Sequence, residues 1–260
     1  MTQPNRMTVS KVSALRGFLA AGFLCFAFAS LADAAEAVSF AASDGGKVYA
    51  DVYPADGHAK ATILLFHQAG SNRAEYAPIA PKLAAMAFNV LAVDARAGGS
   101  MWGRSNETAA GRGSGASYLD ALPDLEGALH YAEKTWPGTP VVAWGSSYSA
   151  SLVFFLAARH PNDVAALLAF SPGEYFGNTS VRAQAAQVRC PAFVTSASSA
   201  DEIAEAKRLF DAIPARQKTQ YVPMQGVHGS ATLRTDSNPR GAAAAWAAVT
   251  AFLNALPGSS

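Results

Sequence analysis

The residues best suited to chemistry lie in the sequence GSSYS, residues 145–149. It differs by one residue from G-x-S-x-G, a turn that holds a nucleophilic serine exposed between a strand and a helix. Ser147 is the serine in register. The turn forces the nucleophile towards positive φ, so the residues two before and two after must be small, as Gly145 and Ser149 are. Ser147 is therefore the candidate nucleophile for acyl transfer, and ordinary turn chemistry is the alternative interpretation.

A carboxylate and a histidine follow the serine in the order that such a nucleophile needs. Asp201 lies between a predicted strand, 192–195, and a helix, which makes it the candidate acid. It could instead cap that helix, and the neighbouring Glu202 could take the catalytic role. His228 lies in a loop between glycines, after the last predicted strand. His228 is the candidate base, with a carboxylate to orient its ring.

Stabilising an oxyanion requires two N–H donors close to the serine. The amide of Tyr148, which follows the nucleophile, is one candidate, and the loop after the first buried strand supplies the other. We assign the second donor to Ala69, with Gln68 as the alternative. His67 is expected to hold this loop by hydrogen bonds rather than to act as a base. Asp94 precedes the serine in the chain, and we expect a structural role for it.

Strands and helices alternate along the sequence, as in a mostly parallel sheet covered by helices on both faces. Parallel sheets of this kind carry their chemistry at the carboxyl ends of the strands, where these candidate residues lie. The predicted strands are 47–53, an antiparallel edge, and then 61–66, 89–94, 141–144, 164–170, 192–195 and 219–222. The predicted helices are 75–88, 117–136, one from about residue 149, 202–212 and 242–256.

The first 34 residues have the pattern of a secretory signal peptide. Basic residues come first, residues 17–32 carry no charge, and Ala32-Asp33-Ala34 offers small residues for cleavage. A retained membrane anchor is the alternative, but the apolar run is shorter than such an anchor needs. We therefore expect a secreted or periplasmic protein with a single domain over residues 35–260.

Composition narrows the classes of partner. Half of the residues are hydrophobic, 15% are charged and the net charge is +1. The chain can therefore bury a large core, while nothing indicates a nucleic-acid partner or a stable membrane partner after signal cleavage. The sequence has no HExxH motif, Cys/His cluster or dinucleotide fingerprint, so no metal or organic cofactor is expected. The oligomeric state stays open.

The order Ser147, Asp201, His228, together with the loop 67–70, resembles the α/β-hydrolase family. The resemblance covers residues 38–256 and is strongest to small dienelactone hydrolase-like and carboxylesterase-like members. Two departures are Ser149 in place of glycine and His-Gln in place of His-Gly. The resemblance implies an α/β-hydrolase fold with about eight strands in a doubly wound sheet and a short cap segment.

The activity that this resemblance implies is that of a serine hydrolase. Ser147, His228 and Asp201 would form the triad, and an acyl-enzyme would be the intermediate. The segment between residue 170 and Cys190 is short, which favours an open pocket for small or medium acyl esters. A binding protein with the same fold but no activity, and an acyltransferase with the same triad, are the alternatives.

Overall fold

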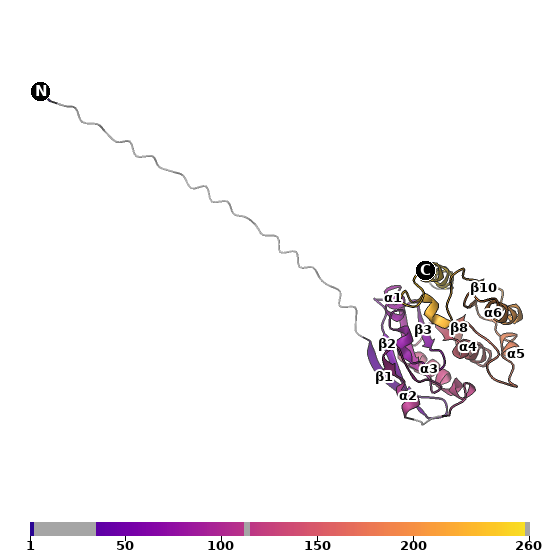
Figure 1. The fold of residues 1–260 in the computed structure, drawn as a ribbon. Coiled ribbons are helices and arrows are strands. Elements are labelled where there is room, and N and C mark those ends of the chain that lie inside the picture. The colour runs from indigo at the N-terminus through magenta and orange to yellow at the C-terminus, as the bar shows by residue number, and fades with distance from the viewer. Residues whose placement is uncertain (3–34, 112–114, 258–260) are drawn as a thin grey trace. The chain divides into compact units, whose positions relative to one another are not determined.

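Uninterrupted apolar runs form the centre of an eight-stranded sheet in the computed structural model of the protein (Figure 1). The first two neighbouring pairs, β1 with β2 and β2 with β4, are antiparallel, and every later pair is parallel. Across the sheet, the strands are β1 (Glu36–Ala41), β2 (Lys47–Tyr53), β4 (Phe88–Asp94), β3 (Ala61–Phe66), β7 (Val141–Ser146), β8 (Val164–Phe170), β9 (Ala192–Thr195) and β10 (Lys218–Tyr221). The expected doubly wound sheet of about eight strands is confirmed. Strand 47–53 is antiparallel as expected but does not lie at the edge, because β1 covers it.

The structure describes residues 1–2, 35–111 and 115–257. The predicted signal peptide, residues 1–34, therefore lies outside the described residues except for the first two. No helix in the described part of the chain is both long and apolar enough to span a membrane.

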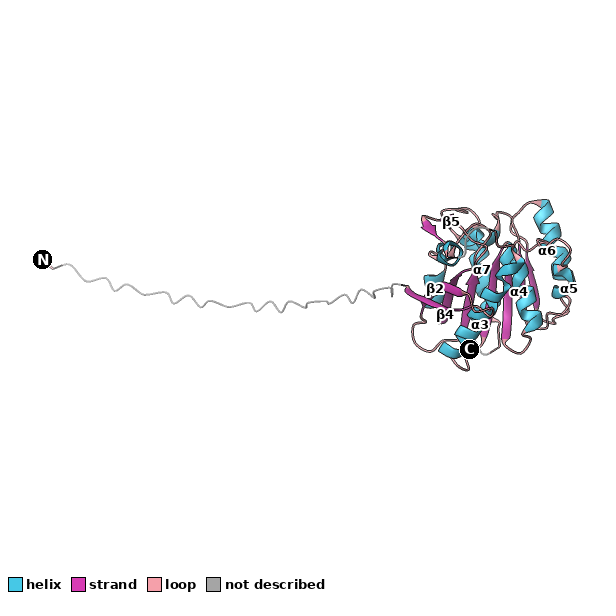
Figure 2. Cartoon of the chain, turned by 90° about the horizontal axis from the view of Figure 1, so that it is seen from below, coloured by secondary structure: helices cyan, strands magenta, loops and turns pink. Residues whose placement is uncertain are grey.

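The helices lie on both faces of the sheet, which buries both faces of the central strands (Figure 2). Along β7, Val141 and Ala143 pack into the core under α3 and α4, while Val142 and Trp144 pack into the opposite core under α1 and α7. The longer helices are α1 (Ala80–Ala85), α3 (Leu122–Thr135), α4 (Tyr148–Arg159), α6 (Ala200–Ala212) and α7 (Ala242–Asn254). Burial on two sides explains why these strands show apolar runs without alternation.

Shorter elements occupy the connections. They are α2 (Glu107–Ala110), α5 (Val181–Ala185), the 3₁₀ turns η1 (Arg73–Tyr76), η2 (Leu119–Ala121) and η3 (Gly229–Leu233), and a small hairpin of β5 (Ser100–Met101) and β6 (Arg104–Ser105). The predicted helix 75–88 is wrong in extent, because η1 and α1 are separate. Pro78 and Pro81 lie in this stretch, and proline is tolerated only in the first turn of a helix.

A buried arginine ties η1 to the first half of the sheet. Arg73 donates to Asp51 at 2.8 Å through Nε, and its two terminal nitrogens pair with Asp94 and Glu107. Asp94 also accepts the backbone N–H of Arg73 and that of Glu107, each at 2.8 Å. This network accounts for Asp94 at the end of β4 and confirms its structural role.

Removing this arginine is expected to destabilise the fold. Arg73→Leu leaves the completely buried Asp94 carboxylate without its ion-pair partner and should lower the free energy of unfolding by about 3 to 5 kcal/mol. Arg104 pairs with the same Asp51 but its side chain is one-third exposed (36%), so Arg104→Leu should cost about 1 kcal/mol or less. Urea unfolding of both variants measures the difference. Equal losses would contradict a special role for the buried pair.

Candidate active site

Ser147 lies at the sharp turn between β7 and α4, with φ +59° and ψ −122°. A positive φ is strained for any residue with a side chain and persists only where the surroundings enforce it. The preceding Ser146 is completely buried in β7, whereas Ser147 retains 7% of its exposure. The turn therefore presents Ser147, the residue that the sequence indicated, at the carboxyl end of the sheet.

The residues two positions before and two positions after Ser147 each have a structural reason for their identity. A Cβ on Gly145 would lie 2.2 Å from the carbonyl oxygen of Ser149, so only glycine fits there. Ser149 replaces the second glycine and is completely buried, and its hydroxyl donates to the carbonyl oxygen of His67 at 2.7 Å. The departure from the usual motif thus adds a hydrogen bond between α4 and the end of β3.

His228 lies within hydrogen-bonding distance of the serine. Its Nε2 is 2.8 Å from the Ser147 hydroxyl, and its Nδ1 is 3.0 Å from Oε1 of Glu202. The next residue, Gly229, has φ +68°, and a Cβ there would lie 2.3 Å from the Ser146 hydroxyl. Its amide donates to the Ser171 hydroxyl at 3.0 Å. Glycine therefore lets the histidine loop pack tightly against the serine turn.

The carboxylate that contacts His228 is Glu202, the alternative that the sequence left open, and not Asp201, the residue first assigned to this position. Both residues lie in the first turn of α6, which begins at Ala200. Asp201 is exposed, and Glu202 is turned inward, where it also accepts the amide N–H of Ala197 at 3.1 Å. Adjacent helical residues point about 100° apart, since a turn contains 3.6 residues. Only one of the two can therefore reach the histidine.

Burial and hydrogen bonding shift the pKa values of this pair. Burial raises the pKa of Glu202, but hydrogen bonds from His228, Ser171 and the Ala197 amide outweigh it and lower the pKa to about 2. The hydrogen bond to Glu202 raises the pKa of His228 above its usual value, although burial opposes this. The carboxylate is thus ionised near neutral pH and stabilises the protonated imidazole.

The loop after β3 packs close to the serine turn, and hydrogen bonds of the His67 ring fix the position of this loop. The completely buried His67 donates from Nδ1 to the carbonyl of Gln68 at 2.7 Å. Its Nε2 accepts from the Ala95 amide and from Asn106, both at 3.0 Å. Burial lowers the pKa of His67, so the ring stays neutral. His67 therefore holds the loop, as expected from the sequence, and does not act as a base.

The two candidate loop amides differ in their partners. The Gln68 amide donates to the buried carboxylate of Glu75 at 2.9 Å. The Ala69 amide has no acceptor among the described residues. The Tyr148 amide is at the first position of α4, where an N–H has no partner within the helix. Ala69 and Tyr148 are thus the amides left available, and the alternative Gln68 is already engaged.

Two residues at this site were not expected from the sequence. Ser171 follows β8 directly with φ +56° and contacts the histidine loop. Its place immediately after a strand was the available signal. Glu75 is completely buried under the serine turn, and its sequence gives no signal because it lies in a stretch with ordinary helical spacing. Within residues 35–111 and 115–257, no three His, Cys, Asp or Glu side chains are grouped as metal ligands.

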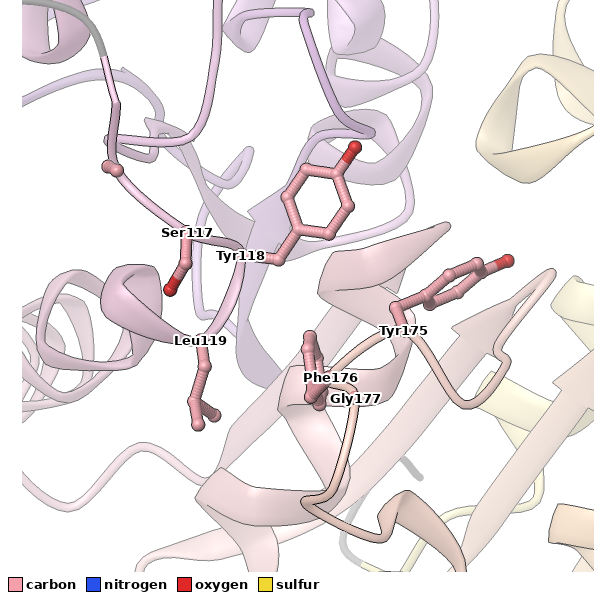
Figure 3. Close-up of a pocket in the computed structure, with 7 residues that line it drawn as sticks. Ser117, Tyr118, Leu119, Tyr175, Phe176 and Gly177 are labelled. Atoms are coloured by element: carbon pink, nitrogen blue, oxygen red, sulfur yellow. The ribbon is translucent and has the colours of Figure 1, made fainter.

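A pocket of about 490 Å³ lies beside the serine turn, between residues 116–119 and 175–177 (Figure 3). The Tyr118 ring stacks on that of Tyr148 with centroids 4.8 Å apart. On the other segment, burial raises the pKa of Tyr175, and the nearby Ser147 hydroxyl opposes that rise. Two of the lining residues, Tyr118 and Tyr175, thus lie next to Tyr148 and Ser147, respectively.

Comparisons with known proteins agree with this arrangement. Residues 57–178 match the family model described as serine aminopeptidase, S33. No curated protein sequence matches the chain. Similar solved structures include the esterase Pf2001 of Pyrococcus furiosus, which has 17% identity and a TM-score of 0.66 over 86% of this chain and 93% of that one.

Two further structures have similar folds. A carboxyl esterase from Bacillus coagulans has 13% identity and a TM-score of 0.66, over 86% of this chain and 99% of that one. The dienelactone hydrolase of Anabaena variabilis has 15% identity and a TM-score of 0.67, over 86% of this chain and 98% of that one. These likenesses agree with the order of strands in the sheet and with the serine turn at the end of β7. The chain has the fold of the α/β-hydrolases, and residues 57–178 of it match the serine aminopeptidase, S33 family model.

Proposed function

We propose that the protein is a serine esterase that hydrolyses small or medium acyl esters through an acyl-enzyme. One observation carries the proposal, namely the continuous chain of contacts from Ser147 through His228 to Glu202, at 2.8 and 3.0 Å. A serine hydroxyl is a weak nucleophile unless an adjacent base takes its proton, and the base works best when a third group orients it. This chain of contacts provides both conditions.

In the first half of the reaction, Ser147 attacks the ester carbonyl while Nε2 of His228 takes the hydroxyl proton. Glu202 accepts a hydrogen bond from the Nδ1–H group of His228 and stabilises the imidazolium that forms. The carbonyl oxygen becomes an oxyanion, and the amides of Tyr148 and Ala69 are the donors that stabilise it. His228 then gives its proton to the departing alcohol, which leaves the acyl group on Ser147.

In the second half, water replaces the alcohol. His228 removes a proton from the water, the resulting hydroxide attacks the acyl-enzyme, and the same two amides stabilise the second oxyanion. Collapse of this intermediate returns the proton to Ser147 and releases the acid. The residues described supply each proton transfer, so no further group is required for the cycle.

Turnover of short-chain para-nitrophenyl esters by the purified protein tests the proposal. We expect saturable release of nitrophenol together with one equivalent of free acid. Adding a primary alcohol and quantifying any new ester separates hydrolysis from acyl transfer. Esters that are not cleaved above the rate of the buffer would contradict the proposal, and new ester in place of acid would favour an acyltransferase.

We also propose that the protein is exported, because residues 1–34 have the pattern of a cleaved signal peptide. We also propose that residues 35–260 fold as a single domain. Mass analysis of the protein isolated from the culture medium or periplasm tests the proposed export and cleavage. An intact N-terminus in the cytoplasm would contradict export.

A further inference from the structure

Aromatic side chains form the walls of the pocket beside Ser147. Tyr118 and Leu119 come from the segment that leads into α3, and Tyr175 and Phe176 come from the segment after β8 (Figure 3). The two segments are far apart in the sequence, and both line this pocket. None of the described residues that line the pocket is charged.

Each aromatic ring is held in place by a neighbour outside the pocket. Tyr118 stacks on Tyr148, and Phe176 packs edge-on against Phe155 of α4 with centroids 5.5 Å apart. The hydroxyl of Tyr175 donates to the carbonyl of Ser171 at 3.0 Å. A ligand therefore meets walls that are already ordered, which reduces the entropy lost on binding.

We infer that this pocket binds an uncharged aromatic group of the ester, so that aromatic esters are the preferred substrate class. The inference rests on the proposed esterase function. Ring faces and edges offer an aromatic ligand stacked and edge-to-face contacts that add to the effect of simple burial. A charged group would lose its hydration there without gaining a partner.

Matched ester pairs test the inference. On the acyl side, ethyl phenylacetate is compared with ethyl cyclohexylacetate, and on the alcohol side, benzyl acetate with cyclohexylmethyl acetate. We expect kcat/KM to be about 10-fold higher for the aromatic member of at least one pair. A para-carboxylate on that aromatic ring should remove the advantage. Equal rates within both pairs would overturn the inference.

Ethyl butanoate separates this inference from the proposed function. If it is cleaved but neither aromatic ester is preferred, only the inference fails. If neither ethyl butanoate nor any aromatic ester is cleaved, the proposed function fails and the inference with it.

Variants of Tyr118 locate the preference in this pocket. The Tyr118 side chain is partly exposed (40%), so its removal spares the core. Tyr118→Ala should reduce kcat/KM for the preferred aromatic ester about 10-fold more than it reduces kcat/KM for ethyl butanoate. Tyr118→Phe keeps the ring and should keep the preference. Equal losses for both esters in Tyr118→Ala would overturn the assignment.

A second inference comes from a buried carboxylate beneath the site. Glu75 accepts the Ser146 hydroxyl on Oε1 at 2.6 Å and the Gln68 amide on Oε2 at 2.9 Å. The Ser146 hydroxyl in turn accepts the Ser230 amide at 2.9 Å. Glu75 is thus bonded to the serine turn and the Ala69 loop, and through Ser146 to the histidine loop.

The charge of Glu75 also affects the pKa of His228. Burial raises the pKa of Glu75, while the hydrogen bonds from Ser146 and Gln68 and the charges of Arg234 and His228 oppose the rise. Conversely, Glu75 is one of the groups that raise the pKa of His228. The Glu75 carboxylate therefore favours the protonated imidazole in addition to Glu202.

We propose that Glu75 is a positioning residue that sets the distance between the oxyanion donors, Ser147 and His228. Glu75→Gln replaces one acceptor oxygen with an amide that faces an N–H or O–H donor, and the loop must shift. Small displacements of oxyanion donors lower the reaction rate about 100-fold. We therefore expect kcat to fall about 10-fold to 100-fold, with little change in KM. The acid limb of the pH profile should also move to lower pH.

Asp124→Asn is the matched control, since Asp124 is another completely buried carboxylate, and its hydrogen bonds go to Arg96 rather than to the serine turn or the histidine loop. It should lower the unfolding midpoint and leave kcat unchanged. If Glu75→Gln does not fold, Ser146→Ala removes one of the same bonds and should lower kcat in the same direction. An unchanged kcat and pH profile in the folded Glu75 variant, or an equal kcat loss in both carboxylate variants, would overturn the proposal.

Discussion

Ser147→Ala is expected to lower kcat for a short-chain ester by about four to six orders of magnitude, because the variant retains the oxyanion donors but has no nucleophile. The fold should persist, since the Ser147 hydroxyl is not part of the core and its hydrogen-bonded neighbour His228 has a side chain that is 40% exposed. Initial rates over a range of ester concentrations measure the effect.

The control for this substitution is Ser180→Ala. Ser180 is the N-cap of α5, where its hydroxyl accepts the Ala183 amide at 3.2 Å. Its loss should slightly reduce stability and leave kcat unchanged. If Ser147→Ala retained about a tenth of the activity, the acyl-enzyme mechanism would be refuted, since an enzyme that loses its nucleophile does not keep that rate.

Glu202→Gln is expected to lower kcat by about 1,000-fold to 10,000-fold, whereas Asp201→Asn should leave it within about twofold of the parent. The amide keeps the shape of Glu202 but cannot stabilise the imidazolium on His228. Asp201 neighbours it on the same helical turn and faces solvent, so it is a control matched in charge and position. Steady-state kinetics of both variants at one pH gives the comparison. The reverse ranking would restore Asp201 as the acid.

The pH profile of the parent enzyme gives a second test of the same pair. Catalysis requires neutral His228, so kcat/KM should fall as the pH drops through the pKa of His228. Glu202 raises that pKa above the usual value of about 6.5. Removing the carboxylate charge should lower the pKa, and the acid limb of Glu202→Gln should shift to lower pH. A shift to higher pH would contradict the hydrogen bond from His228 to Glu202.

The sheet was predictable because its central strands are buried on both faces. The strands β3, β8 and β9 have the predicted bounds, since each is a continuous apolar run that ends at a polar residue or a turn. The edge strand β1 was missed because its residues are mostly exposed or half-buried, so no apolar run marks it. The hairpin of β5 and β6 was missed because each strand has only two residues.

The site was predictable as far as the residues follow strand ends. Ser147 and His228 each lie after a strand of the parallel sheet, where sequence order alone indicates proximity. The choice between Asp201 and Glu202 depends on where α6 begins, and helix boundaries are uncertain by a residue or two. Glu75 could not be recognised because its role depends on contacts with segments at Gln68 and Ser146, which pattern analysis does not bring together.

The most direct test of the central claim is reaction of the purified protein with a fluorophosphonate probe, followed by mass mapping of the labelled peptide. The geometry of Ser147, His228 and Glu202 predicts a single adduct on Ser147. It also predicts much slower labelling in His228→Ala and none in Ser147→Ala. A folded protein that takes no label, or an adduct on another serine, would contradict the proposal that Ser147 is an activated nucleophile.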